Sequence, residues 1–314
     1  MPLEPRLRPL VALGRLADRH RSGPIVERRA QEARLARRGG WLVMQPGPRP
    51  RSIEDRSVAV DGGRIRVRLY RPPTPGPHPL YVFFHGGGWC VGTLDERDPR
   101  CRTVCVDADC VVASVEYRLA PECQFPTAPD DGYTALCRLV EDARALGVDP
   151  ARVAVGGESS GGNVAAVVAL RARDRSGPAL CHQWLDVPVT DCTLAQPGHR
   201  EVPDGYLLDA AAIDEFLAAY LPDPALATDP SASPLRADRH DGLPPAWITT
   251  AEYDKLRGDG EAYARALEAA GVPTTHVRLD GHLHASFAFT RLLASSRAHE
   301  RDSVAALRAA FAAA

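Results

Sequence analysis

The stretch VAVGGESSGG, residues 153–162, places a short apolar run directly before a glycine-rich turn. A run rich in alanine and valine follows, with helical character from Ser160 to Arg173. A strand that turns sharply into a helix forces its central residue into a strained conformation, and glycines at 157 and 161 have no Cβ to clash there. The stretch therefore predicts an exposed nucleophile, Ser159, at the carboxyl end of a strand.

Two readings of this turn compete with a nucleophile at Ser159. An ordinary serine cap at the start of a helix would produce the same short pattern. Ser160 is a second hydroxyl candidate, but it lies outside the centre of the GxSxG frame, so we assign it a backbone N–H donor role. The start of a helix supplies unpaired amides and the positive end of the helix dipole, which both favour an anion.

A second glycine run supports the first. The apolar run Leu80–Phe84 ends in HGGGW, residues 85–89. Successive glycines let a loop approach a substrate oxygen closely and point its amides inward, as an oxyanion hole requires, although a flexible structural loop could share the pattern. We expect His85 to order this loop rather than transfer protons, and Cys90 to line the site without reacting.

A serine nucleophile needs an imidazole base and a carboxylate that orients the base. Asp254 follows the predicted strand Trp247–Thr250, and both His282 and His284 follow the last predicted strand. Asp254 is therefore the candidate for the acid. Position in the sequence alone does not decide whether His282 or His284 is the base. Several other histidines stand in polar surroundings and are predicted at the surface: His20, His78, His199, His240 and His299.

Short apolar runs alternate with helical patterns along most of the chain. The predicted strands are Val58–Val60, Ile65–Tyr70, Leu80–Phe84, Val111–Val115, Val153–Val155, Leu185–Val189, Trp247–Thr250 and His276–Leu279. The predicted helices include Pro24–Arg38, ended by Gly39 and Gly40, and Pro129–Leu146, Ser160–Arg173, Ala210–Leu221, Glu261–Ala270 and Ser303–Ala313. This alternation indicates an α/β fold with a mostly parallel central sheet flanked by helices.

The alternation breaks at two places, which define the expected domains. We expect residues 1–50 to form a helical N-terminal appendage. Residues 192–243 form too long a connection for a compact domain, so we expect them to form a helical cap inserted into the core. The catalytic α/β core then consists of residues 51–191 and 244–314.

Charge and composition narrow the possible partners. The formal net charge is -2 and the pI is about 6.6, so no basic field is available to bind nucleic acid. No stretch approaches the roughly 20 apolar residues of a spanning helix, and no signal-peptide core is evident, so we expect a cytoplasmic protein. Eight cysteines without paired CxxC spacing predict free thiols, and neither a metal nor an organic cofactor is implied.

Several motifs in the same order resemble the hormone-sensitive-lipase family, also called bacterial family IV, of α/β-hydrolase esterases. They are HGGGW at 85–89, YRLAPE at 117–122, GESSGG at 157–162, PVTD at 188–191, AEYDKLRGDGEAYA at 251–264 and GHLH at 281–284. The resemblance implies a triad of Ser159, Asp254 and His284, because the family places its histidine three residues after a glycine, here Gly281. His282 is then expected to be a neighbour at the rim of the site. It also implies an oxyanion hole formed by the amides of Gly87, Gly88 and Ser160.

The same resemblance implies hydrolysis of carboxylic esters with short to medium acyl chains through an acyl-enzyme, and it suggests a homodimer. The chain departs from the family at Glu158, usually Asp; at Lys255, usually Pro; and at Ala285 and Ser286, where a glycine is usual. Hydrolysis of amides, carbamates or lactones by the same triad stays open. A small-molecule receptor on the same fold is a further alternative, although all three triad positions are filled.

Overall fold

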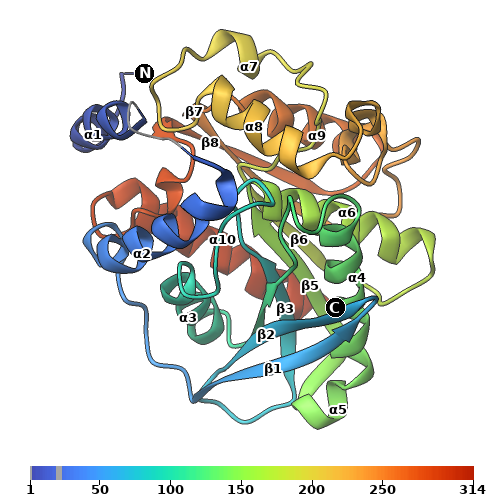
Figure 1. The fold of residues 1–314 in the computed structure, drawn as a ribbon. Helices are drawn as coiled ribbons and strands as arrows, with labels where there is room; N and C mark the ends of the chain where they lie inside the picture. Colours follow the sequence, from blue (N-terminus) through green and yellow to red (C-terminus); the bar gives the residue numbers. More distant parts are fainter. Residues whose placement is uncertain (1, 19–22) are drawn as a thin grey trace.

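An eight-stranded sheet forms the centre of the molecule in the computed structural model, which describes residues 2–18 and 23–314 (Figure 1). The strands are β1 (Ser52–Val60), β2 (Gly63–Arg71), β3 (His78–Phe84), β4 (Val111–Glu116), β5 (Val148–Glu158), β6 (His182–Asp186), β7 (Ala246–Tyr253) and β8 (Thr274–Leu283). Their order is β1-β2-β4-β3-β5-β6-β7-β8. The two pairs that β2 forms, with β1 and with β4, are antiparallel, and every pair from β4 to β8 is parallel. The predicted mostly parallel sheet is confirmed.

Helices cover both faces of this sheet. The α-helices are α1 (Arg8–Asp18), α2 (Ile25–Val43), α3 (Asp98–Asp107), α4 (Thr127–Glu141), α5 (Ala143–Leu146), α6 (Ser160–Asp174), α7 (Gly198–Glu201), α8 (Ala210–Tyr220), α9 (Arg257–Ala269) and α10 (Ala294–Ala313). Four short 3-10 helices add η1 (Pro5–Leu7), η2 (Pro224–Thr228), η3 (Pro234–Arg236) and η4 (Ser286–Ala288). In the described part of the chain, no helix is both long and apolar enough to cross a bilayer.

The alternation of side chains along β3 shows how the core is divided between the two faces. Leu80, Val82 and Phe84 pack into the core cluster that includes α4, α6 and α9. Tyr81 and Phe83 pack into a second cluster with α3 and α10. Because both faces are buried, every residue of β3 is apolar or shielded, which is why the run reads as continuously hydrophobic.

The strand order reverses beside β3. The chain leaves β3 for β4 on one side, whereas β5 lies on the other side of β3 and continues to β6. Loops that follow adjacent parallel strands then diverge and open a crevice at the carboxyl ends of the strands. The two glycine motifs follow β3 and β5, so both lie at this crevice.

Several predicted boundaries differ from the structure. The strand predicted over Leu185–Val189 is wrong, because β6 ends at Asp186 and Val187 has a positive φ of 42°. Gly39 and Gly40 do not end a helix, since α2 runs through both. The sequence also gave no indication of α3.

Segments far apart in the sequence meet above the sheet. The segment between β6 and β7, where the sequence predicts an insertion, contains α7 and α8, and Arg28 of α2 forms an ion pair with Glu215 of α8. Arg29 donates hydrogen bonds to the carbonyl oxygens of Cys90 at 2.7 Å and Ala120 at 2.8 Å. These contacts bind the N-terminal segment both to the insertion and to the loop after β3.

Candidate active site

Ser159 lies between β5 and α6 in a conformation that side chains rarely adopt, with φ 54° and ψ −122°. The turn is so tight that a Cβ at Gly157 would overlap the carbonyl oxygen of Gly161. A Cβ at Gly161 would in turn overlap the carbonyl oxygen of Phe84 on β3. Glycine is therefore required at both positions, and the turn pushes Ser159 out into the crevice.

The structure brings Ser159, His284 and Asp254 together from three separate segments. His284 Nε2 lies 3.0 Å from Ser159 Oγ, and His284 Nδ1 lies 2.8 Å from Asp254 Oδ2. Asp254 is 1% exposed, and its other oxygen accepts the Leu256 amide at 2.9 Å. A carboxylate beside Nδ1 favours the tautomer in which Nδ1 carries the proton, so Nε2 can accept the serine proton.

The glycine loop after β3 faces this serine. Gly87 and Gly88 have positive φ values of 124° and 57°. The Gly87 carbonyl accepts the amides of Cys90 and Val91, both at 3.0 Å, which closes the loop into a tight turn. The amides of Gly87 and Gly88 donate to no acceptor within residues 2–18 and 23–314. With the amide of Ser160 at the start of α6, they are available to an oxygen in the crevice.

His85 and Tyr117 hold the base of the glycine loop. The His85 ring is buried, its Nδ1 lies 2.8 Å from the Gly86 carbonyl oxygen, and it stacks on Tyr117 with centroids 4.5 Å apart. Tyr117 donates its hydroxyl proton to the His85 carbonyl at 2.8 Å. Burial lowers the pKa of His85. These are the contacts of a residue that orders the loop, as we predicted.

Glu158 connects the serine turn to the glycine loop. Its carboxylate accepts the Gly86 amide at 3.4 Å and also a hydrogen bond from Arg97 Nε. The side chain is buried, so the Arg97 guanidinium supplies the opposite charge that a buried carboxylate needs. A longer side chain than the aspartate usual in the resembled family is thus accommodated with a partner.

A mostly apolar cavity of about 190 Å³ opens beside Ser159. The serine, His284 and the glycine loop form one part of its wall. Further wall residues come from the insertion, from the turn after β7 and from the loop before α3: Leu194, Leu208, Ile213, Phe216, Leu217, Leu256, Glu96 and Arg97. Phe216 also lies against Gly88, where any Cβ would overlap its ring. The cavity can therefore hold a small, largely apolar group against the serine.

Some predicted surroundings of the site are wrong. His282 is not at the rim: it is buried between the hydroxyls of Ser286 (2.9 Å) and Ser295 (2.8 Å), and burial lowers its pKa to about 4. Cys90 is fully buried and does not border the described cavity, and burial raises its pKa to about 12. A buried free thiol behaves as a small hydrophobic group, which explains why Cys90 lies in the core and not at the cavity.

Most histidines predicted at the surface are not there. His78, His240 and His299 are buried, and the His199 side chain contacts Asp259, while His20 lies outside the described residues. The polar neighbours in sequence were misleading because these side chains find partners from distant segments. All eight cysteines are free thiols, and the described residues contain no group of three or more His, Cys, Asp or Glu that could hold a metal.

No sequence motif indicates the buried charged cluster that lies beneath Ser159. The Asp186 carbonyl accepts the Ser159 amide at 2.9 Å, and its carboxylate contacts Arg100 and, at 3.1 Å, His299. Burial would raise the pKa of Asp186, but Arg100 and His299 lower it to about 2. The one available signal was an acidic residue inside the apolar run predicted as the strand Leu185–Val189.

Known proteins resemble this chain over most of its length. Residues 81–288 match the family described as alpha/beta hydrolase fold. The carboxylesterase NlhH of Mycobacterium tuberculosis is 46% identical over 70% of each chain. The carboxylic ester hydrolase LipN of the same organism is 42% identical over 84% of this chain and 72% of its own. The ester-hydrolase EH1AB1 from the metagenome of Lake Arreo superposes with a TM-score of 0.92 at 35% identity, covering 99% of both chains.

The family match covers more than half of the chain, and both relatives exceed 40% identity. The chain therefore belongs to the alpha/beta hydrolase fold family and, within it, to the hormone-sensitive-lipase family of esterases that its motifs indicate.

Proposed function

We propose that the protein is a carboxylic-ester hydrolase in which Ser159, His284 and Asp254 act as the catalytic triad. One observation carries this proposal: two consecutive hydrogen-bond contacts, 3.0 Å and 2.8 Å long, connect the three side chains at the wall of an apolar cavity. Relatives named carboxylesterase and carboxylic ester hydrolase support the same reaction.

Acylation begins with the serine. His284 Nε2 accepts the hydroxyl proton as Ser159 Oγ attacks the ester carbonyl, and Asp254 stabilises the imidazolium that forms. The carbonyl oxygen becomes an oxyanion and accepts hydrogen bonds from the amides of Gly87, Gly88 and Ser160. His284 then donates its proton to the leaving alcohol, and the acyl group stays on Ser159.

Deacylation repeats the sequence with water. His284 accepts a proton from a water molecule, which attacks the acyl carbonyl while the same three amides hold the second oxyanion. Collapse of this intermediate releases the acid and returns the proton from His284 to Ser159. No step needs a group beyond these side chains and amides.

The cavity favours short to medium acyl chains. Its volume of about 190 Å³ and its leucine, isoleucine and phenylalanine walls suit a small apolar group. Residues 192–243, together with the N-terminal appendage at 1–50, serve as the cap over a core of residues 51–191 and 244–314, because the insertion supplies Leu194, Leu208 and Phe216 to the cavity wall. A small-molecule ester is therefore the partner of this site.

Two expectations concern the whole protein rather than the site. A cytoplasmic location and a homodimer stay predictions, the first from the sequence and the second from the family resemblance. Light scattering of the purified protein after gel filtration will measure its mass directly. A mass of one chain at micromolar concentration would exclude the dimer under those conditions.

Labelling by a fluorophosphonate, combined with hydrolysis of p-nitrophenyl butyrate, tests the proposed function. The wild type should hydrolyse the ester and carry one phosphonyl group, located on Ser159 by mass spectrometry. Ser159→Ala should lose the label and about 10⁴-fold or more in kcat. Ser160→Ala keeps the backbone amide and should still be labelled at Ser159. Undiminished hydrolysis by Ser159→Ala would refute the proposal.

A further inference from the structure

Lys255 is the only lysine of the chain, and it directly follows Asp254. Its side chain is buried, with the residue only 4% exposed. Lysine is rarely buried to this degree without partners, because removing an ammonium group from water is costly. The partners of Lys255 therefore indicate what the buried charge does.

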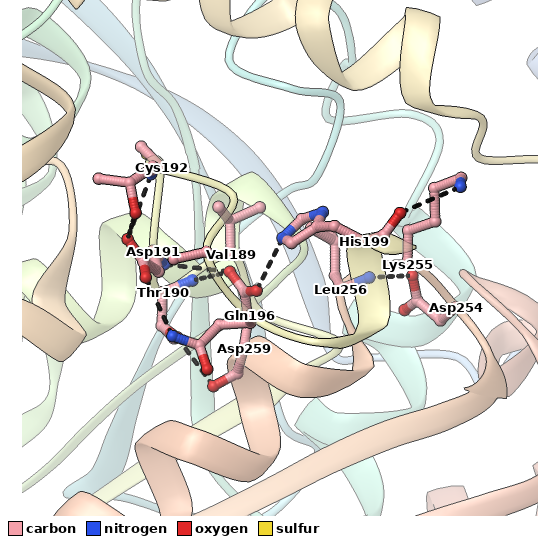
Figure 2. A network of polar contacts seen from close by, with 12 residues as sticks. Val189, Thr190, Asp191, Cys192, Gln196, His199, Asp254, Lys255, Leu256 and Asp259 are labelled. Atoms are coloured by element: carbon pink, nitrogen blue, oxygen red, sulfur yellow. Dashed lines mark hydrogen bonds and ion pairs between the residues drawn. The ribbon is translucent and has the colours of Figure 1, made fainter. Parts of the chain in front are cut away.

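Among the described residues, every polar partner of the Lys255 ammonium lies on one short stretch of the insertion. Nζ donates to the Val202 carbonyl at 2.7 Å and to the His199 carbonyl at 3.4 Å, and it lies 3.1 Å from Asp204 Oδ1. An ammonium has three N–H donors, so these contacts can use all of them. In Figure 2, His199 lies between Asp259 and Lys255, with its ring toward Asp259 and its backbone carbonyl toward the Lys255 ammonium.

The stretch that Lys255 holds belongs to the cavity wall. We define the pocket segment as residues 194–208, which contains the contacts of Lys255 and has wall residues Leu194 and Leu208 at its ends. The segment approaches the lysine turn so closely that a Cβ on Gly198 would lie 2.5 Å from the Lys255 carbonyl oxygen. Close packing on the turn at Lys255 therefore determines where this part of the cavity wall lies.

The same turn carries the triad acid. Asp254 Oδ2 contacts His284 Nδ1 and Asp254 Oδ1 accepts the Leu256 amide, while Leu256 itself lines the cavity. Three consecutive residues therefore orient the base, fasten the pocket segment and form part of the wall. We propose that Lys255 is a positioning residue that fixes the pocket segment relative to the triad and thereby determines how tightly the enzyme binds longer ester substrates.

Other contacts also reach the pocket segment, so loss of Lys255 need not release it completely. His199 Nε2 lies 3.0 Å from Asp259 Oδ1, and Asp259 Oδ2 accepts the amides of Thr190 and Asp191 (Figure 2). Arg257 also forms a 2.7 Å ion pair with Glu201, whose side chain is 59% exposed. The exposed pair is expected to contribute little, which makes it a matched control for the buried lysine.

This inference rests on the proposed ester hydrolysis and predicts a change in KM rather than in the chemical step. Lys255→Met keeps an unbranched side chain as far as Cε but removes the charged nitrogen and all three donors. We expect KM for p-nitrophenyl butyrate and hexanoate to rise about fivefold or more, because a loosened wall is less well organised for the apolar chain. The kcat for p-nitrophenyl acetate should stay within about twofold, since the triad contacts remain.

Three comparisons separate this role from a general effect on folding. Lys255→Arg should bring KM for the longer esters back toward the wild-type value, and Glu201→Gln should leave it unchanged. Trypsin should cleave after the exposed Arg200 faster in folded Lys255→Met than in the wild type. If Lys255→Met does not fold, Asp204→Asn removes the charge of the ion-pair partner, while its side-chain oxygen can still accept the Ala210 amide, and it must raise KM for butyrate in the same direction.

The results that overturn the inference differ from those that overturn the function. Unchanged KM for butyrate and hexanoate in a folded Lys255→Met, or in Asp204→Asn where the first variant fails to fold, would end it. An equal fall in kcat for every ester, with KM unchanged, would show instead that Lys255 acts on the triad. The proposed function, in contrast, fails if Ser159→Ala remains active, a result that does not depend on Lys255.

Discussion

Ser159 has a positive φ of 54°, which is costly for any residue with a Cβ. The surrounding contacts hold it there: its amide donates to Asp186, and its carbonyl accepts the amides of Asn163 at 3.1 Å and Val189 at 3.2 Å. These three backbone hydrogen bonds hold Ser159 in its strained conformation and thereby fix the position of Oγ relative to His284. The first two predictions concern residues that act on this position.

Asp254→Asn should lower kcat for p-nitrophenyl butyrate about 10³- to 10⁴-fold. An amide at this position can donate to His284 Nδ1, which favours the tautomer whose Nε2 carries a proton and cannot accept one from serine. Circular dichroism should show an unchanged fold. The exposed Asp280, paired with Arg278, offers a control, because Asp280→Asn alters a surface carboxylate only. A tenfold or smaller loss in Asp254→Asn would contradict the assigned role.

Gly88→Ala should lower kcat about 10²- to 10³-fold, the usual effect of losing an oxyanion donor. A Cβ at this position would overlap the Phe216 ring, and φ is 57°, so the loop must move and its amides with it. Gly88→Ala combined with Phe216→Ala should recover part of the loss, because the steric overlap is removed. Full activity in Gly88→Ala would exclude the loop from the oxyanion hole.

Chemistry restricted the candidates in the sequence to Ser159, Asp254 and the two histidines His282 and His284, and the family resemblance then selected His284. A serine between glycines, followed by a carboxylate and a histidine each placed after a strand, leaves few choices. Nothing in the sequence announced the buried partners Arg100 and His299, because buried ion pairs depend on contacts between distant segments. His282 was misplaced for the same reason.

At the scale of elements, hydrophobic pattern placed the strands well where both faces are buried. The run Leu80–Phe84 lies within β3, and Val111–Val115 lies within β4. The hydrophobic pattern predicted a strand at Leu185–Val189, and this prediction is wrong. Val187 and Val189 are buried but lie outside the sheet, and apolarity does not distinguish a strand from a buried turn. The pattern also failed at α3, whose sequence DPRCRTVCVD has charged residues on both sides of its buried cysteines.

The course of α2 through Gly39 leads to a prediction at this scale. A Cβ at Gly39 would meet nothing within 4 Å, so alanine fits the helix without strain. Gly39→Ala should raise the free energy of unfolding by up to about 1 kcal/mol, which corresponds to a Tm increase of roughly 1–3 °C. Differential scanning calorimetry will measure the shift.

The same substitution elsewhere provides the contrast. Gly161→Ala would place a Cβ on the carbonyl oxygen of Phe84, so it should lower Tm or prevent folding. A lower Tm in Gly39→Ala would mean that α2 does not continue through this position in solution.

At the scale of the whole molecule, the sequence predicts that the insertion and the N-terminal segment are separate from the core, but it could not predict the contacts between these two segments. The Arg28–Glu215 ion pair joins residues 187 positions apart, and Arg29 reaches the loop after β3. Periodicity reports local structure only, so it cannot select such partners. The arrangement of wall residues from both the core and the insertion follows from these long-range contacts.

Buried histidines make the stability of the whole protein depend on pH. Burial lowers the pKa of His282 to about 4, and burial also lowers the pKa of His182 to about 4. In the unfolded chain these histidines titrate near 6.5. Below about pH 6.5 the unfolded state therefore binds protons that the folded state excludes, and their contribution to stability is lost progressively as pH falls toward 4.

Urea unfolding between pH 7.5 and pH 4.5 measures this effect. We expect the free energy of unfolding to fall with decreasing pH, by at most about 1.4 kcal/mol per pH unit for each histidine. His282→Gln should flatten the fall by one proton, although it lowers stability at pH 7.5 by disturbing the contacts with Ser286 and Ser295. An identical pH slope in the variant and the wild type would contradict the low pKa.

The most direct test of the proposed mechanism is a crystal structure of the enzyme trapped with a small alkyl phosphonate, which resembles the tetrahedral intermediate. We predict a covalent bond to Ser159 Oγ, with the phosphonyl oxygen within about 3.1 Å of the amides of Gly87, Gly88 and Ser160, and the alkyl group against Leu194 and Leu208. His284 should remain hydrogen-bonded to Asp254. A phosphonate bound to another residue, or an oxygen pointing away from the glycine loop, would contradict the account.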